Sequence, residues 1–158
     1  MSGVIRAFAP ILVLLSGGAI AQVPPPPPLA DQVQVSRELV ADFNSKDVNA
    51  YAALLSDQVH VYEDGKLVAR NKHEWMHRFG PMLNGTGVTF ELAPGYSSSG
   101  RLLYIEYFNS MASWGRTPPS DCCWGYSAVA YDIQGKKIVT IRRLTGGAIR
   151  LDRNGNPR

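Results

Sequence analysis

The spacing of the apolar residues changes once along this chain, and this change constrains its fold more than any other feature. Over 31–44, Val35, Leu39 and Phe43 recur at the interval of one helix face. From 59–63 onward, beginning with VHVYE, the apolar residues alternate as they do in a half-buried strand. The sequence therefore predicts helices first and strands afterwards, an order typical of an α+β domain.

Capping and turn residues divide the chain into elements. Asp47 is a favourable N-cap for a second, short helix, and Asn71 is one for a third helix, which we expect to end at the Gly-Pro of 80–81. The Asp-Gly at 64–65 predicts a hairpin between two short strands. Longer strands, linked as an antiparallel meander, are expected at 88–93, 101–114, 122–133 and 137–144.

The N-terminal residues are not expected to belong to the folded domain. Arg6 precedes an uncharged, largely apolar run, and the small-x-small sequence at 19–21 follows it, so residues 1–21 indicate a secretory signal peptide. Five consecutive prolines at 24–28 indicate a stiff linker over 22–29, because proline fixes φ and has no N–H. We therefore expect a periplasmic or secreted protein that has no membrane segment after signal removal.

A single domain is expected at 30–145, followed by a Gly-rich, polar tail at 146–158 that we expect to be mobile. The net charge is +3, and loss of the signal with its one arginine lowers it to +2. A charge this small predicts no nucleic-acid partner. The two cysteines are the adjacent Cys122 and Cys123, which are poorly placed to bond each other. We expect one buried and one exposed thiol, with a disulfide to another chain as the alternative.

The segment HEWMH at 73–77 matches the H-E-x-x-H pattern of zinc metalloproteases. In those enzymes two histidines bind zinc and the glutamate takes a proton from the attacking water. On a helical wheel, however, His73 and His77 lie almost opposite an apolar stripe that contains Trp75 and Phe79. The two histidines are therefore expected to face away from the core.

The other residues of this segment have structural explanations, and a third zinc ligand is missing. Glu74 follows the Asn71 cap by three residues and can complete a capping box. The longer metzincin pattern requires a third histidine where this chain has Leu83, while Glu91 and Glu106 fall in strands rather than on a second helix. We predict no metal and no cofactor, and we rank a zinc-dependent peptidase third among the functions.

The segment VADFNSKDVNAYAALLSDQVHVYEDGKLVARNKHEW, at 40–75, resembles the nuclear transport factor 2-like superfamily, which includes SnoaL-like polyketide cyclases and ketosteroid isomerases. It has a helix that ends at Asn44, a Lys-Asp break at 46–47, a helix end at 54–57, the 64–65 turn and a third helix. The resemblance implies a cone-shaped, curved antiparallel sheet wrapped around three N-terminal helices. It also implies a pocket at the open end of the cone.

The resemblance implies a position for a catalytic group. Counted from Asp47, the general base of the ketosteroid isomerases falls on Glu63, which shares a strand face with two valines and would be partly desolvated. The positions of the two oxyanion donors fall on Leu39 and near Ser127, so steroid isomerisation is not expected. The alternative interpretation of Glu63 is a solvated carboxylate next to a turn.

Three functions stay open on these grounds. The first is binding of a small hydrophobic or carbonyl-containing molecule in an apolar pocket, with Glu63 as the base for isomerase-, cyclase- or dehydratase-like proton transfer. The second is a non-catalytic domain that forms a homodimer through its sheet or docks to a partner, and the third is the zinc peptidase. An enclosed pocket with a perturbed acid favours the first, and an exposed apolar sheet face favours the second.

Overall fold

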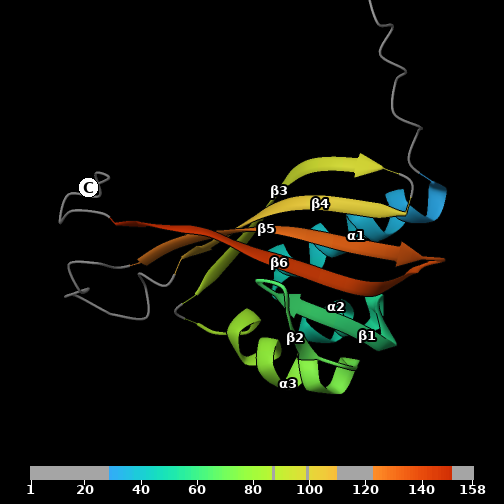
Figure 1. Cartoon of the computed structure of the whole chain (residues 1–158), viewed down its shortest axis with the longest axis horizontal. Helices are drawn as coiled ribbons and strands as arrows, with labels where there is room; N and C mark the ends of the chain where they lie inside the picture. The colour runs from blue at the N-terminus through green and yellow to red at the C-terminus, as the bar shows by residue number, and fades with distance from the viewer. Residues whose placement is uncertain (1–28, 87, 99, 110–122, 151–158) are drawn as a thin grey trace, which may run out of the picture.

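Helices and strands follow one another in the predicted order in the computed structural model, which describes residues 29–86, 88–98, 100–109 and 123–150 (Figure 1). The fold class is α+β, as predicted. The helices are α1 (Ala30–Ser45), α2 (Val48–Leu54) and α3 (Lys72–Leu83). The strands are β1 (Leu55–Glu63), β2 (Lys66–Ala69), β3 (Thr89–Ser98), β4 (Arg101–Asn109), β5 (Cys123–Gln134) and β6 (Lys137–Arg150).

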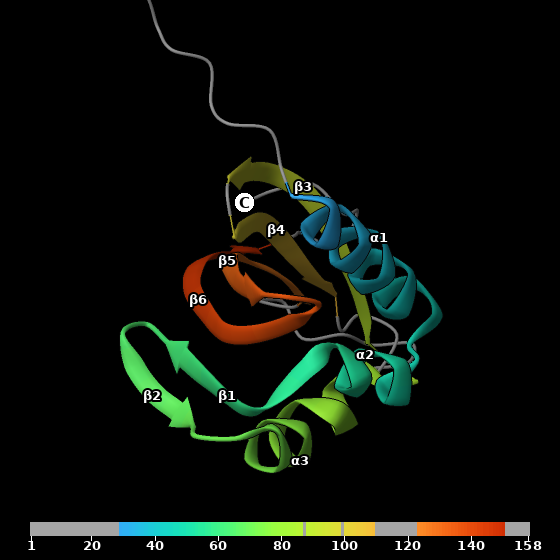
Figure 2. The same ribbon diagram turned by 90° about the vertical axis from the view of Figure 1, so that its right-hand side faces the viewer.

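The six strands form one curved sheet in the order β2-β1-β6-β5-β4-β3. Viewed end-on, the sheet curls without closing, with α1 beside β3 and β4 and with α3 below β1 (Figure 2). All neighbouring pairs are antiparallel except β1 and β6, which are parallel. The sequence did not predict this parallel pairing. This pair joins the last strand of the meander to the hairpin, and its register places Leu55 beside Ile138 and Val61 beside Ile141, so that four buried side chains meet.

The predicted caps are present at both shorter helices. The Asp47 carboxylate accepts a hydrogen bond from the Ala50 N–H at 2.9 Å, and the Asn71 side chain accepts one from the Glu74 N–H at 2.9 Å. Glu74 completes its capping box one residue earlier than expected, because its carboxylate accepts from the backbone N–H of Arg70 at 2.8 Å. Local polar residues therefore begin α2 and α3 where the sequence predicted.

The predicted end of α3 at the Gly-Pro of 80–81 is wrong. The helix continues through both residues to Leu83, and the Asn84 N–H donates to the Gly80 carbonyl at 3.0 Å. Pro81 removes one N–H donor from the helix and crowds the carbonyl one turn earlier, but the turn that follows buries Leu83 completely. Gly80 is itself buried, and a Cβ there would lie 3.4 Å from Val48, so α3 packs directly against α2 at this position.

Aromatic side chains from the helices fill the space inside the sheet. Phe43, Tyr51, Trp75 and Phe79 are each 1% exposed, and the rings of Trp75 and Phe79 stack with their centroids 4.7 Å apart. The Trp75 indole N–H donates to the Tyr51 hydroxyl at 2.9 Å, so these two buried polar groups satisfy each other. This aromatic cluster is the core that holds the three helices against the curved sheet.

The last strand extends beyond the boundary that the sequence placed at residue 145. Strand β6 continues to Arg150, and a register shift opposite Tyr126 accommodates the extra residue. A Cβ at Gly146 would lie 2.1 Å from the Tyr126 ring, and Gly147 has φ of 147°. The Gly-Gly pair therefore forms a β-bulge that makes room for the Tyr126 ring, and it is not the start of the tail.

Several predictions fall outside the described residues. These are the signal at 1–21, the linker up to residue 28, Cys122, and the tail after residue 150; the side chain of Cys123 is also outside them. Among the described helices, none is both long and apolar enough to cross a membrane.

Candidate functional site

A cavity of about 290 Å³ opens on the inner face of the sheet, the face that packs against the helices. Met82 from α3, Phe90 from β3 and Phe108 from β4 give it apolar walls. Its polar groups come from the central strands, with Glu106 from β4, Ser127 from β5, and Arg143 and Thr145 from β6. The cavity therefore combines an apolar wall with a small set of polar groups, which is the usual composition of a small-molecule site.

Glu106 is the most deeply buried charged group at the cavity. Strand alternation places it on the same face of β4 as Leu102 and Tyr104, and it is only 2% exposed. Its carboxylate accepts a hydrogen bond from the Arg143 guanidinium. Burial raises the pKa of the Glu106 carboxyl above its ordinary value, and the charge of Glu63 adds to the rise, although Arg143 opposes both effects.

Arg143 connects two carboxylates and two aromatic rings. One guanidinium nitrogen donates to Glu106, and the other lies 3.0 Å from a Glu63 oxygen. The guanidinium carbon is 5.7 Å from the Trp75 ring centroid and 5.3 Å from that of Phe79, both within cation–π range. Its Nε is buried and has no hydrogen-bond partner among the described residues. Two carboxylates and two aromatic rings therefore hold this guanidinium in place.

Glu63, the predicted base, lies beside the cavity but does not line it. One carboxylate oxygen is 2.6 Å from Arg78 and the other is 3.0 Å from Arg143. Its side chain is 24% exposed, which agrees with the partial desolvation expected from its strand face. With an arginine on each oxygen, Glu63 contacts the cavity only through Arg143.

Buried phenols surround the Glu106–Arg143 pair. Tyr51 and Tyr131 are each 1% exposed, and burial raises the pKa of both hydroxyls well above the ordinary value. The negative charge of Glu106 adds to this rise, whereas Arg143 opposes it. Both tyrosines therefore stay neutral at physiological pH, and the charges in this part of the core reside on the carboxylates and arginines.

The HEWMH histidines lie on the solvent-facing side of α3, as predicted. His73 and His77 are exposed, while Trp75 and Phe79 point into the core. Glu74 is occupied with capping its own helix, where it bonds Arg70 and the Asn71 side chain. Within the described residues, no cluster of three or more His, Cys, Asp or Glu side chains is arranged to hold a metal ion.

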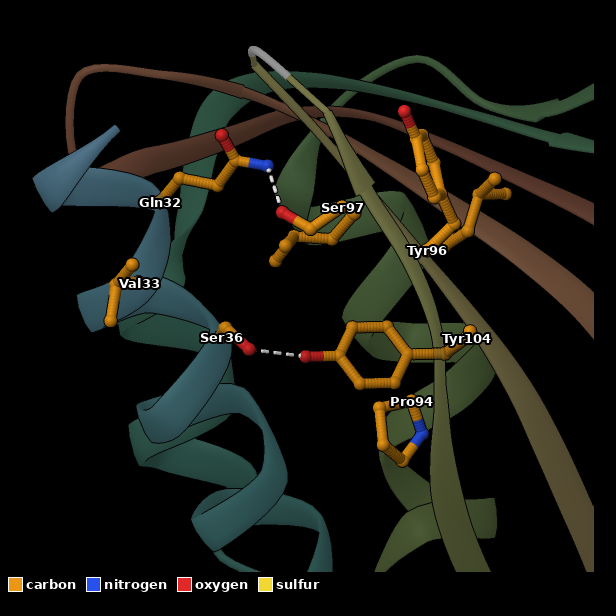
Figure 3. Close-up of a pocket in the computed structure, with 10 residues that line it drawn as sticks. Gln32, Val33, Ser36, Pro94, Tyr96, Ser97 and Tyr104 are labelled. Carbon is orange, nitrogen blue, oxygen red and sulfur yellow. Dashed lines mark hydrogen bonds between the residues drawn. The ribbon is translucent and has the colours of Figure 1, made fainter. Parts of the chain in front are cut away.

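A second hollow of about 200 Å³, which we call the α1–β3 groove, lies between α1 and strands β3 and β4 (Figure 3). Gln32 reaches across from α1 and donates to Ser97 Oγ at 2.7 Å, and Ser36 shares a hydrogen bond of 2.5 Å with the Tyr104 hydroxyl. Figure 3 shows both side chains pointing from the helix toward the sheet, with Pro94 beside Tyr104. The polar side chains among the described residues that line the groove are hydroxyls and one amide, and none of them is charged.

Two residues of the inner cavity, Glu106 and Arg143, were not predicted from the sequence to be functional. A signal for each was present, because Glu106 interrupts an apolar face formed by Leu102, Tyr104 and Phe108, and Arg143 shares a face with Ile141. A charged residue on a core-facing strand position needs a partner or a function. Ser127, which was considered only as a position for an oxyanion donor, also lines the cavity and pairs with Glu106 across β4 and β5.

Solved structures of other proteins share this architecture. A protein of unknown function from Mesorhizobium loti, described as NTF2-like (nuclear transport factor 2-like), aligns with a TM-score of 0.60 at 14% identity, over 74% of this chain and 92% of that chain. The chain described here has an NTF2-like fold. This result confirms the resemblance seen in the sequence.

Two further solved structures with a similar fold carry names of activities. A putative polyketide cyclase from Sinorhizobium meliloti aligns with a TM-score of 0.53 at 11% identity, over 70% of this chain and 93% of that chain. An LEH-like epoxide hydrolase from M. tuberculosis aligns with a TM-score of 0.52 at 12% identity, over 73% of this chain and 82% of that chain. No protein-family profile matches the sequence, and no curated protein matches it.

Proposed function

We propose that this protein binds a small, largely apolar molecule with a carbonyl or related oxygen in the inner cavity, and that Glu106 exchanges a proton with that molecule. The observation that supports this most strongly is a carboxyl group only 2% exposed in the wall of a cavity that also has apolar walls. Buried carboxyls with shifted pKa values are concentrated at functional sites. The cyclase and hydrolase names of two structural neighbours also support small-molecule chemistry for this fold.

Glu106 suits proton transfer because of its environment. In its ionised form it takes a proton from the carbon next to the carbonyl: the C–H bond breaks, an O–H bond forms on Glu106, and the electron pair moves onto the carbonyl oxygen. The raised pKa makes the carboxylate a stronger base than an ordinary glutamate. Returning the proton to the same or another carbon completes an exchange or an isomerisation and restores the carboxylate.

Ser127 is the group best placed to assist this step. It lies opposite Glu106 in the β4–β5 register and lines the same cavity. Thr145 also lines the cavity, but its hydroxyl already donates to Asp64 at 2.9 Å. We therefore assign the donor to the carbonyl oxygen to Ser127, whose hydroxyl can stabilise the developing negative charge.

Glu63 becomes a positioning residue in this proposal. Its carboxylate holds one side of the Arg143 guanidinium at 3.0 Å, while Arg143 holds Glu106 with the other side. A substrate proton could reach Glu63 only by displacing Arg78 or Arg143. In this proposal the catalytic base is therefore Glu106, which shares Arg143 with Glu63, and not Glu63 itself.

The test measures proton exchange directly. The protein is incubated with cyclopentanone or cyclohexanone in D₂O, and loss of the α-proton signals is followed by NMR. We expect faster exchange with the wild-type protein than with buffer, loss of the acceleration in Glu106→Gln, and its retention in Glu91→Gln, which removes an exposed carboxylate of β3. Equal acceleration by wild type and Glu106→Gln, or none by either, would contradict the proposal.

A second candidate function, homodimerisation, is favoured by the outer face of the sheet. Leu103, Tyr107, Tyr126 and Leu144 are 36%, 38%, 36% and 57% exposed, and the register aligns Tyr107 with Tyr126. An apolar sheet face of this kind is typical of a protein–protein contact. We expect a dimer in sedimentation analysis of the full chain and a monomer for Leu103→Lys; a monomeric wild-type chain would exclude this function.

We also propose export, on the sequence features at 1–21. If the chain is expressed with its leader in a bacterial host, the purified protein should begin at Gln22. Mass spectrometry of the intact protein measures this directly, and a retained leader in the soluble fraction would contradict it.

A further inference from the structure

Four side chains of alternating charge form a row from the protein surface to the wall of the inner cavity. In order they are 55%, 24%, 13% and 2% exposed: Arg78, Glu63, Arg143 and Glu106. A guanidinium nitrogen of Arg78 lies 2.6 Å from one Glu63 oxygen, and a nitrogen of Arg143 lies 3.0 Å from the other. The two inner members of this ion-pair row line the cavity, and the two outer members do not.

Arg143 divides its hydrogen bonds between two carboxylates. One terminal nitrogen contacts Glu63 and the other contacts Glu106, so neither carboxylate receives the two parallel bonds of the strongest arginine–carboxylate geometry. The Arg143 Nε has no hydrogen-bond partner among the described residues. The guanidinium therefore has an N–H in reserve, and it can turn toward the carboxylate whose charge is less well balanced.

The backbone around this arginine is fixed, so only side chains can adjust. Glu63 and Arg143 are neighbours in the parallel β1–β6 register, and the Asp64 N–H donates to the Arg143 carbonyl at 2.9 Å. The rings of Trp75 and Phe79 lie within cation–π range of the guanidinium. A change in the balance between the two carboxylates therefore redistributes the N–H groups of Arg143 without moving the strands.

Arg78 determines how much of the Glu63 charge remains for Arg143. It comes from α3 and contacts the Glu63 oxygen that Arg143 does not contact. With Arg78 in place, the ion-pair row contains two arginines and two carboxylates, and its charges balance. Without Arg78, both carboxylates compete for one guanidinium, so the share that binds Glu106 becomes smaller.

We propose that Arg78 is a positioning residue for the proton-transfer group, because by holding Glu63 from the solvent side it leaves Arg143 available to Glu106. This inference rests on the function proposed for Glu106 and adds a residue that regulates it from outside the cavity. Arg78 acts through two intervening side chains and does not touch the ligand.

The charges that act on Glu106 give the direction of the effect. Among the described residues they are Arg143 from β6 and Glu63 from β1. Tyr51 from α2 and Tyr131 from β5 also face this carboxyl, but both phenols stay neutral at physiological pH. Loss of the outermost arginine weakens the bond from Arg143 and leaves Glu63 with an unbalanced negative charge. Both changes raise the pKa of Glu106 further.

Carboxyl ¹³C NMR titration of Glu106 in the full chain tests this proposal. High ionic strength is used, because salt screens the exposed charge of Arg78 from any direct action on Glu106. We expect Arg78→Gln to move the Glu106 midpoint to higher pH. Arg78→Lys should keep the wild-type midpoint, because lysine can make the single contact that this arginine makes. The control is Arg37→Gln, which removes an exposed positive charge of α1 and should leave the midpoint unchanged.

A double-mutant cycle shows whether Arg78 acts through Glu63. Glu63→Gln should lower the Glu106 midpoint, because it removes a neighbouring negative charge. Addition of Arg78→Gln to this variant should then change nothing. An unchanged midpoint in Arg78→Gln alone would overturn the proposal. A shift of equal size with and without the Glu63 carboxylate would also overturn it, because Arg78 would then act on Glu106 without the ion-pair row.

The proposed reaction is tested separately in the same variants. Exchange of the cyclopentanone α-protons should begin at higher pH in Arg78→Gln than in the wild type, because the base is the ionised carboxylate. A midpoint that shifts while the pH profile of exchange stays in place would support the role of Arg78 and contradict Glu106 as the base. An unchanged midpoint would contradict the role of Arg78 whatever the exchange activity, so the two proposals can fail independently.

Discussion

Glu106 and Asp132 lie on opposite faces of the same sheet, each beside arginine, yet their pKa values shift in opposite directions. On the outer face, Asp132 contacts Arg101 at 2.5 Å and also Arg142, and these hydrogen bonds lower its pKa although partial burial works to raise it. On the inner face, burial dominates and raises the pKa of Glu106 in spite of Arg143. The arginines of the outer cluster are 49% and 46% exposed, whereas Arg143 is 13% exposed.

The difference shows that an arginine neighbour does not by itself decide how a carboxyl titrates. In the outer cluster water reaches both arginines, and together they outweigh the desolvation of Asp132, whereas in the core both charges lose their hydration and the ion pair compensates only in part. The inner cluster is therefore the one in which burial decides the pKa of the carboxyl, and it faces a cavity. The adjacent residues Arg142 and Arg143 point to opposite faces, so the chain contains its own matched pair for testing this difference.

The largest expected effect comes from removing the inner arginine. Arg143→Met leaves Glu106 buried without its cation, and we expect a loss of about 3–5 kcal/mol in the free energy of unfolding. Arg142→Met should lose about 1 kcal/mol or less, because its partner Asp132 keeps Arg101 and contact with water. Urea unfolding at pH 7 measures both, and equal losses would remove the distinction between the two faces.

A smaller effect with a definite pH dependence is expected for Glu106→Gln. Because the folded-state pKa is raised, the native protein binds the Glu106 proton more tightly than the unfolded chain does. This contribution to stability is complete below the unfolded-state pKa and is lost as pH rises through the folded-state pKa. Relative to Glu106→Gln, the wild type should thus become less stable as pH rises above the ordinary glutamate value. Parallel stability curves for the two proteins would contradict the raised pKa.

The Arg143 guanidinium lies over the Trp75 ring, and Trp75 in turn bonds the Tyr51 hydroxyl. This Trp75–Tyr51 hydrogen bond can be tested separately. Trp75→Phe keeps an aromatic ring but removes the indole donor to the buried Tyr51 hydroxyl. We expect a loss of about 1–3 kcal/mol, the usual cost of a buried group left without its partner. Thermal and urea unfolding give the value, and Tyr51→Phe combined with Trp75→Phe should recover part of the loss. A double mutant that shows full additivity would argue against the bond.

The smallest effect is expected at the outer cluster itself. Asp132→Asn removes the charge between Arg101 and Arg142, and we expect a change of about 1 kcal/mol or less that shrinks further as salt is added. The lowered pKa of Asp132 means that its contribution is present above the unfolded-state pKa and is lost as pH falls through the folded-state pKa. Stability measured from pH 2 to pH 7 at two salt concentrations checks both statements; a large, salt-insensitive loss would contradict them.

The sequence predicted the local features and missed those that depend on distant contacts. Periodicity correctly placed the exposed His73 and His77, and the caps at Asp47 and Asn71 marked two helix starts, because these features depend on neighbouring residues. The parallel pairing of β1 with β6 joins the two ends of the domain and leaves no local pattern. Glu106 was identifiable in principle from its apolar strand face, but its partner Arg143 is 37 residues away along the chain, and only the fold brings the two together.

A carboxyl ¹³C NMR titration of the full chain tests the central claim most directly, with assignments taken from Glu106→Gln and Asp132→Asn. A buried proton-transfer group at the cavity requires that the Glu106 midpoint lie above the ordinary glutamate value of about 4.3, while Asp132 lies below the ordinary aspartate value of about 3.9. If Glu106 titrates at or below the ordinary glutamate value, the inner carboxyl behaves like the outer one, and the account of the cavity as the functional site is contradicted.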